Sequence, residues 1–118
     1  MQRDMDLIRQ ILLLIEAAPT DQIFFVPEID GNSINEISYH IKILDQAGFV
    51  QSSRLALSGD EIWKVRGLTW NGHEFLDAAR DETRWEKAKT VMKEKGGGMV
   101  VEILKTILID LMKRQVLG

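Results

Sequence analysis

Apolar positions recur at helical spacing at the start of the chain, where they predict a helix over residues 4–17. The residues that form this stripe are Met5, Ile8, Ile11, Leu12 and Ile15. Spacings of three and four residues place such side chains on one helix face, and Asp4 is suited to cap the helix. Pro19 disfavours helical geometry at Ala18, so the helix should end near Ala17.

A second helix is predicted over residues 33–47. Ser33 and Glu36 have the spacing of a capping box, and Gly48 is a typical residue to end a helix. The apolar face consists of Ile34, Ile37, Ile41, Leu44 and Ala47. Between the two helices, residues 21–33 contain many β-forming residues, but Pro27 limits them to a short edge strand or an irregular segment.

The remainder of the chain predicts a β-hairpin and two more helices. Two β-forming runs flank Gly59, which suits the turn of a hairpin, and Thr69 can cap the helix that follows. Residues 70–95 predict one helix whose apolar stripe narrows, as in a helix that projects from the core, and the glycines at 96–98 should end it. The last helix is strongly amphipathic, so it either completes the core or pairs with a second subunit.

This order of elements predicts an α+β fold, a winged helix-turn-helix-like domain with a β-hairpin wing and two C-terminal helices. The expected division is a winged-helix-like domain at 1–95 and a C-terminal amphipathic helix at 96–118, packed on that domain or on a dimer partner. One feature departs from the pattern. The positioning helix should lie within 20–32, where the sequence instead predicts it to be missing or reduced to a turn, which alters the part that crosses a DNA backbone.

Four segments carry a resemblance that spans nearly the whole chain: "RDMDLIRQILLLIE", "EISYHIKILDQAGF", "LTWNGHEFLDAARDETRWEKAK" and "GGGMVVEILKTIL". Together they resemble a family of short uncharacterised proteins from bacterial and phage genomes, a domain of unknown function. The resemblance implies a winged-helix fold and a prokaryotic or prophage setting. It implies no established activity, ligand or catalytic residue.

Charge is distributed unevenly along the 118 residues. Residues 1–50 carry three basic and eight acidic side chains, whereas residues 51–118 carry twelve basic and ten acidic ones. A surface that binds anions should therefore lie in the second half. The chain has no cysteine, which excludes disulfides and thiolate metal sites, and the apolar run at 11–15 is too short to span a membrane. We expect a cytoplasmic protein.

Catalytic chemistry has little support in the sequence. His73 and Asp77 are four residues apart on a predicted helix and could share a metal ion, but this spacing is common. His40 is the other histidine of the chain, and no phosphate-binding glycine loop is present. We expect neither an enzyme nor a cofactor or metal site.

Binding of double-stranded DNA is the leading functional hypothesis, with a transcription-regulatory role and weak or regulated binding by a dimer. The residues predicted to face bases are Asn35, Ser38, Tyr39 and Lys42. Those predicted to face phosphates are Arg54, Lys64 and Arg66. Trp63, Trp70 and Trp85 are expected to pack in the core or between helices and not to stack on bases.

The rival hypothesis is a protein-interaction module that keeps the winged-helix fold and uses the 33–47 helix or the C-terminal helix. The acidic N-terminal half favours it, because that half would repel DNA. The two hypotheses predict different surfaces. DNA binding requires positive charge gathered around the hairpin, and an interaction module requires an exposed apolar patch.

Overall fold

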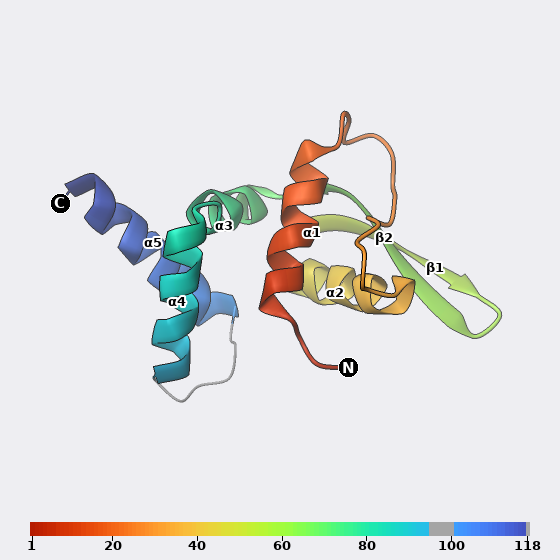
Figure 1. Cartoon of the computed structure of the whole chain (residues 1–118). Coiled ribbons are helices and arrows are strands. Elements are labelled where there is room, and N and C mark those ends of the chain that lie inside the picture. The colour runs from red at the N-terminus through yellow and green to blue at the C-terminus, as the bar shows by residue number, and fades with distance from the viewer. Residues whose placement is uncertain (95–100, 118) are drawn as a thin grey trace. The chain divides into compact units, whose positions relative to one another are not determined.

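The computed structural model describes residues 1–94 and 101–117, which form a mixed α+β fold (Figure 1). The described elements are α1 (Met5–Ala17), α2 (Ile34–Gln46), β1 (Val50–Leu57), β2 (Asp60–Leu68), α3 (Trp70–Ala79), α4 (Glu82–Glu94) and α5 (Val101–Leu117). The chain divides into two compact units, Met1–His73 and Glu74–Gly118. The division into 1–95 and 96–118 stays a prediction, because compactness alone does not show which parts fold independently.

α1 has both of its predicted ends. The carboxylate of Asp4 accepts hydrogen bonds from the backbone N–H groups of Asp6 (3.0 Å) and Leu7 (3.2 Å), and the helix ends at Ala17, two residues before Pro19. Its apolar stripe is buried at Met5, Leu7, Ile8, Ile11, Leu12 and Ile15. The periodicity therefore predicted this helix correctly.

α2 begins with the predicted capping box. The Ser33 hydroxyl accepts from the Glu36 N–H (3.1 Å), and the Glu36 carboxylate accepts from the Ser33 N–H (3.2 Å). At the other end Gly48 has a φ of 79°, which favours glycine, and the Phe49 N–H then donates to the Leu44 carbonyl (3.0 Å). This turn directs the chain into β1.

His40 joins α2 to the start of α1 and is only 2% exposed. The Asp4 N–H donates to Nε2 of the imidazole (2.9 Å), and Nδ1 lies 2.7 Å from the Glu36 carbonyl. A ring nitrogen that accepts from an N–H cannot itself carry a hydrogen, so in neutral His40 the hydrogen is on Nδ1 and donates to that carbonyl. Both nitrogens are therefore satisfied inside the protein.

The predicted hairpin is present, with its turn at Ser58 (φ 47°) and Gly59 (φ 90°). Two successive positive φ values are typical of a two-residue turn that matches the twist of the strands. The register shifts once, because Gln51 pairs with Gly67 whereas Ser52 pairs with Val65. Arg66 is thus the additional residue of a bulge in β2.

Residues 18–33 contain no helix, as the sequence predicted, and form the long loop between α1 and α2 in Figure 1. Phe25 makes an isolated antiparallel bridge with Val65, through two backbone hydrogen bonds of 2.9 Å. Two residues before Val65 on β2, the Trp63 N–H donates to the hydroxyl of Ser38 on α2 (2.8 Å). The expected short edge strand is therefore a single bridged residue.

Gly72 allows the start of α3 to pack closely on the chain before β1. A Cβ at this position would overlap the carbonyl oxygen of Phe49. The predicted cap of this helix is also present, because the Thr69 hydroxyl accepts from the Gly72 N–H (3.1 Å).

The prediction of one helix over 70–95 is wrong, because α3 and α4 are separate helices. The Asp81 carboxylate accepts from the Arg84 N–H (2.8 Å) and so caps α4. The buried Arg84 guanidinium turns back and donates to the carbonyls of Ala78 (2.7 Å) and Asp77 (3.2 Å), near the end of α3. Asp81 thus caps the start of α4, and Arg84 caps the end of α3.

α4 packs against α5 within the second unit, so its narrow apolar stripe covers another helix, and projection of this segment from the first domain stays a prediction. Trp85, Ala88 and Met92 of α4 are buried, as are Leu104 and Leu108 of α5. Arg84 adds a hydrogen bond to Gln115 of α5 (2.6 Å). Pairing of α5 with a second subunit stays a prediction, and the helix break expected at 96–98 lies outside the described residues.

Candidate functional site

The residues predicted to face DNA bases differ in their exposure on α2. Asn35 is exposed, and Tyr39 and Lys42 are partly buried. Ser38 is only 3% exposed, because it faces β2 and its hydroxyl accepts the Trp63 N–H. The expectation that Ser38 lies on the solvent face is therefore wrong, and base contacts by the other three residues stay a prediction.

A fixed negative charge lies at the start of α2, beside Asn35. The backbone N–H of Ser33 and, more weakly, the side chain of Asn32 donate to the Glu36 carboxylate and lower its pKa. Glu36 is therefore ionised at neutral pH. A charged carboxylate at this place opposes the approach of a phosphate backbone.

The three predicted phosphate-binding cations of the hairpin do not lie together. Lys64 pairs with Ser53, and Arg54 pairs with the adjacent Trp63, so alternation along the strands puts Lys64 and Arg54 on opposite faces of the hairpin. The Arg54 guanidinium lies 3.7 Å from the Glu61 carboxylate. No single face of the hairpin therefore presents all of the positive charge.

Arg66 is held by its own neighbours at the bulge. Its Nε donates to Oε1 of Gln51 (3.1 Å), and its guanidinium carbon lies 5.2 Å from the centre of the Phe24 ring. Both contacts orient the guanidinium, and a cation over an aromatic face is attracted to it. Arg66 thus has structural partners within the first unit.

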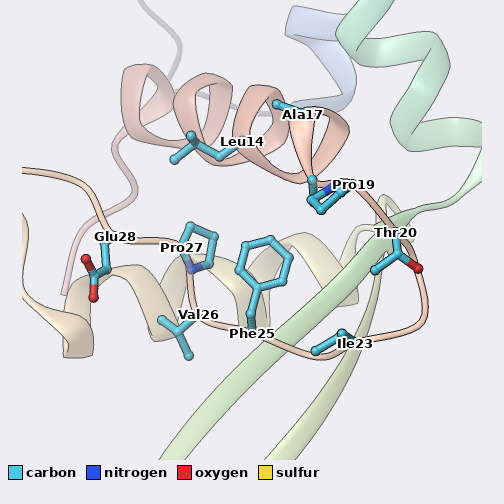
Figure 2. Close-up of a pocket in the computed structure, with 10 residues that line it drawn as sticks. Leu14, Ala17, Pro19, Thr20, Ile23, Phe25, Val26, Pro27 and Glu28 are labelled. Atoms are coloured by element: carbon cyan, nitrogen blue, oxygen red, sulfur yellow. The ribbon is translucent and has the colours of Figure 1, made fainter.

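A groove that the sequence did not reveal lies between α1 and the loop that follows it (Figure 2). We call it the α1 groove; its volume is about 550 Å³. Leu14 lies on the helix side, opposite the rings of Phe25 and Pro27 on the loop side. Ile23 is 64% exposed at one end of the groove and Leu14 is 39% exposed. The groove is therefore an accessible apolar surface.

Acidic side chains stand near both ends of the α1 groove. Figure 2 shows Glu28 at one end and Thr20 at the other. Asp21 follows Thr20 and lines an adjoining hollow of about 480 Å³, which shares Ala18, Pro19 and Thr20 with the groove. Among the residues that the structure describes, the lining of the α1 groove includes no basic side chain.

The only sign of the α1 groove in the sequence was a weak one. Ile23, Phe24, Phe25 and Val26 form an apolar run without the alternation of a strand that covers a core.

The three tryptophans differ in their burial. Trp85 is buried and Trp63 is partly buried, but Trp70 is 78% exposed, so its expected place in the core is wrong.

Comparison with known proteins places the chain in a family. Residues 2–98 match the family described as hypothetical protein DUF2513. The chain belongs to the DUF2513 family. A relative from Haemophilus influenzae, described as an uncharacterised protein, is 33% identical over 108 residues, which cover 91% of this chain and 92% of the relative. No solved structure matches the chain.

Membership of DUF2513 confirms the resemblance to a family of short uncharacterised proteins. The phage or prophage setting stays a prediction. In the parts of this DUF2513 protein that the structure describes, no group of three or more His, Asp or Glu side chains is arranged to hold a metal ion. Within residues 1–94 and 101–117, every helix is too short or too polar to cross a lipid bilayer.

Proposed function

We propose that this DUF2513 protein is a protein-interaction module that keeps a winged-helix fold. Its binding site is the α1 groove, which takes up a short segment of a partner protein. The observation that carries the proposal is the accessible apolar groove, with Ile23 and Leu14 left exposed beside Phe25 and Pro27. Exposed apolar surface of this kind is typical of protein-binding sites.

The winged-helix assignment is supported by the order and pairing of elements in Met1–His73. A helix precedes a bridged residue, Phe25, and a second helix precedes the hairpin. Phe25 pairs with one edge of β2 and β1 pairs with the other edge, so β2 is central. This is the arrangement expected of a wing sheet, without the positioning helix.

Charge favours a protein partner over DNA. Residues 1–73 carry ten acidic and six basic side chains, and the hairpin cations are divided between its two faces. Strong binding of duplex DNA commonly involves roughly six to ten phosphate contacts, because each contact adds to the affinity by releasing counterions. Arg54, Lys64 and Arg66 together supply far fewer.

The apolar side chains of the α1 groove can supply useful binding energy. Full burial of an aliphatic side chain contributes about 1.5 to 3 kcal/mol, and Ile23 is largely exposed before binding. Pro19 and Pro27 restrict the backbone of the loop, which lowers the entropy lost when a partner orders it. A partner that buries Ile23 and Leu14 would therefore gain affinity from a small contact.

Peptide selection tests the proposal. The full chain is immobilised, and a phage-displayed library of random dodecapeptides is selected against it. We expect enriched peptides that bind the native chain, fail to bind Ile23→Ser, and still bind Ile103→Ser, whose substitution removes a comparably exposed isoleucine on α5. Enriched peptides that bind all three forms equally, or no enrichment at all, would refute binding at the α1 groove.

DNA binding is the second candidate function. It is favoured by the exposed Asn35 and the partly exposed Lys42, which lie on a helix followed directly by a hairpin. The test is fluorescence anisotropy of a random-sequence duplex at low and at physiological salt, with Lys64→Ala and Arg66→Ala as variants. Affinity that falls with salt and with these substitutions supports this candidate. Absence of binding even at low salt removes it.

A further inference from the structure

We infer that the segment bound in the α1 groove combines aliphatic side chains with lysine or arginine. This inference rests on the proposed function and adds the chemistry of the partner. It follows from three features of the first unit: the apolar middle of the groove, the carboxylates near its two ends, and the end of α1 that borders it.

The middle of the groove selects aliphatic side chains. Its walls are Leu14 on α1 and Phe25 and Pro27 on the loop, with Ile23 exposed at one end. A volume of about 550 Å³ is in the range of pockets that bind small ligands, so it can hold only a few side chains of a peptide. The bound segment is therefore short.

The ends of the groove select positive charge. Glu28 is exposed at one end, and Asp21 is exposed in the hollow that adjoins the other. A segment whose aliphatic side chains fill the middle brings its flanking residues close to these carboxylates. Lysine or arginine at the flanks would be attracted there, and aspartate or glutamate would be repelled.

The helix end beside the groove has the same preference. The last turn of α1 contains no basic residue, and Ala17 and Ala18 of this end line the groove. A helix C-terminus carries a partial negative charge from its last carbonyl groups, and a cation placed near it is stabilised. A basic residue of the partner would supply the charge that α1 itself lacks.

Among the described residues, the basic side chains that line the adjoining hollow are Arg66 and His73, and they do not reverse this preference. The hollow also contains the carboxylates of Glu16 and Asp21. Arg66 is turned toward Gln51 and the ring of Phe24, both from its own unit. Across the described linings of groove and hollow, the three carboxylates of Glu16, Asp21 and Glu28 therefore outnumber Arg66 and His73.

The selected peptides test the inference separately from the proposed function. We expect the peptides that lose binding to Ile23→Ser to be rich in aliphatic residues together with lysine or arginine. Groove-dependent peptides that are neutral or acidic would overturn the inference while leaving the proposed function in place. If no selected peptide depends on Ile23, both fail.

Charge variants give a second readout with one synthetic peptide from the selection, labelled with fluorescein and titrated by anisotropy. Asp21→Asn and Glu28→Gln keep the side-chain shape and remove the charge. We expect each to weaken binding about two- to fivefold, in line with exposed ion pairs, with a smaller effect at high salt. The matched control is Asp60→Asn, an exposed carboxylate at the hairpin turn. Equal affinity of all forms would overturn the inference.

Discussion

Single polar residues fix the ends of the helices in this protein. Asp4 caps α1, Ser33 caps α2 and Asp81 caps α4, each by accepting a backbone N–H that the helix cannot satisfy. Ser33 was predictable from its spacing to Glu36. Asp81 was not, because it lies among charged residues that also suit the middle of an exposed helix.

The charge of Glu36 should make the stability of the protein depend on acid pH. Its pKa is lowered in the folded state by the Ser33 N–H and the Asn32 side chain, from an ordinary value of 4.5. The stabilisation is therefore complete above about that value and is lost as the pH falls through the lower, folded pKa. In urea titrations at several pH values, the stability advantage of the native chain over Glu36→Gln should be largest near neutrality and disappear in acid. An advantage that is constant with pH would contradict this explanation.

Gly72 should not tolerate even one added methyl group. In Gly72→Ala the new Cβ would overlap the Phe49 carbonyl, which belongs to the backbone and cannot rotate away. We expect the free energy of unfolding to fall by about 1 to 3 kcal/mol, measured by urea denaturation. Asn71→Ala, at the exposed neighbouring position, should change it by less than about 0.5 kcal/mol. Equal changes in the free energy of unfolding of the two variants would show that the start of α3 can shift to make room for the methyl group.

At the scale of elements, periodicity and turn residues predicted most of the fold. α1, α2 and the hairpin follow from local signals such as Pro19, the capping box and Gly59, each of which acts within a few residues. The break between α3 and α4 did not follow, because it depends on Arg84 reaching the carbonyls of Asp77 and Ala78. In the sequence alone, Asp81 and Arg84 also have the spacing of an ion pair on one continuous helix.

Arg84 should therefore be essential for the order of the second unit. Arg84→Met keeps much of the apolar stem and removes the donors to Ala78, Asp77 and Gln115. Loss of hydrogen bonds from a charged group costs about 1.5 to 3 kcal/mol each, so we expect lower stability and faster amide hydrogen exchange at 78–84. Lys87→Met, on the exposed side of α4, is the control. Similar exchange rates in both variants would disprove the capping role.

Ser38 distinguishes a structural from a DNA-contacting role for this side of α2. Ser38→Ala leaves the Trp63 N–H without its partner, which should cost about 1 to 3 kcal/mol of stability. Asn35→Ala, at an exposed position, should have little effect on stability. Chemical denaturation of both variants measures the difference. If Ser38→Ala is as stable as the native chain, the hydroxyl has no such role.

At the scale of the whole molecule, the α1 groove could not be predicted from the sequence. It is formed by one side of α1 and by a loop without regular structure, and no periodicity describes where such a loop turns its side chains. The excess of acidic residues in the first half was evident in the sequence. Only the structure shows that two of them, Glu28 and Asp21, lie around an apolar surface. The match to DUF2513 identifies the family but does not indicate the α1 groove.

Peptide binding in the α1 groove is tested most directly by an NMR titration of the ¹⁵N-labelled full chain with a groove-dependent peptide from the selection. If the peptide binds in the α1 groove, the shifted amide signals should cluster at the end of α1 and in residues 18–28, including Leu14, Thr20 and Ile23, with little change in the hairpin. Shifts that cluster on α2 and the hairpin instead would contradict it, because they would place the binding surface where the DNA hypothesis puts it.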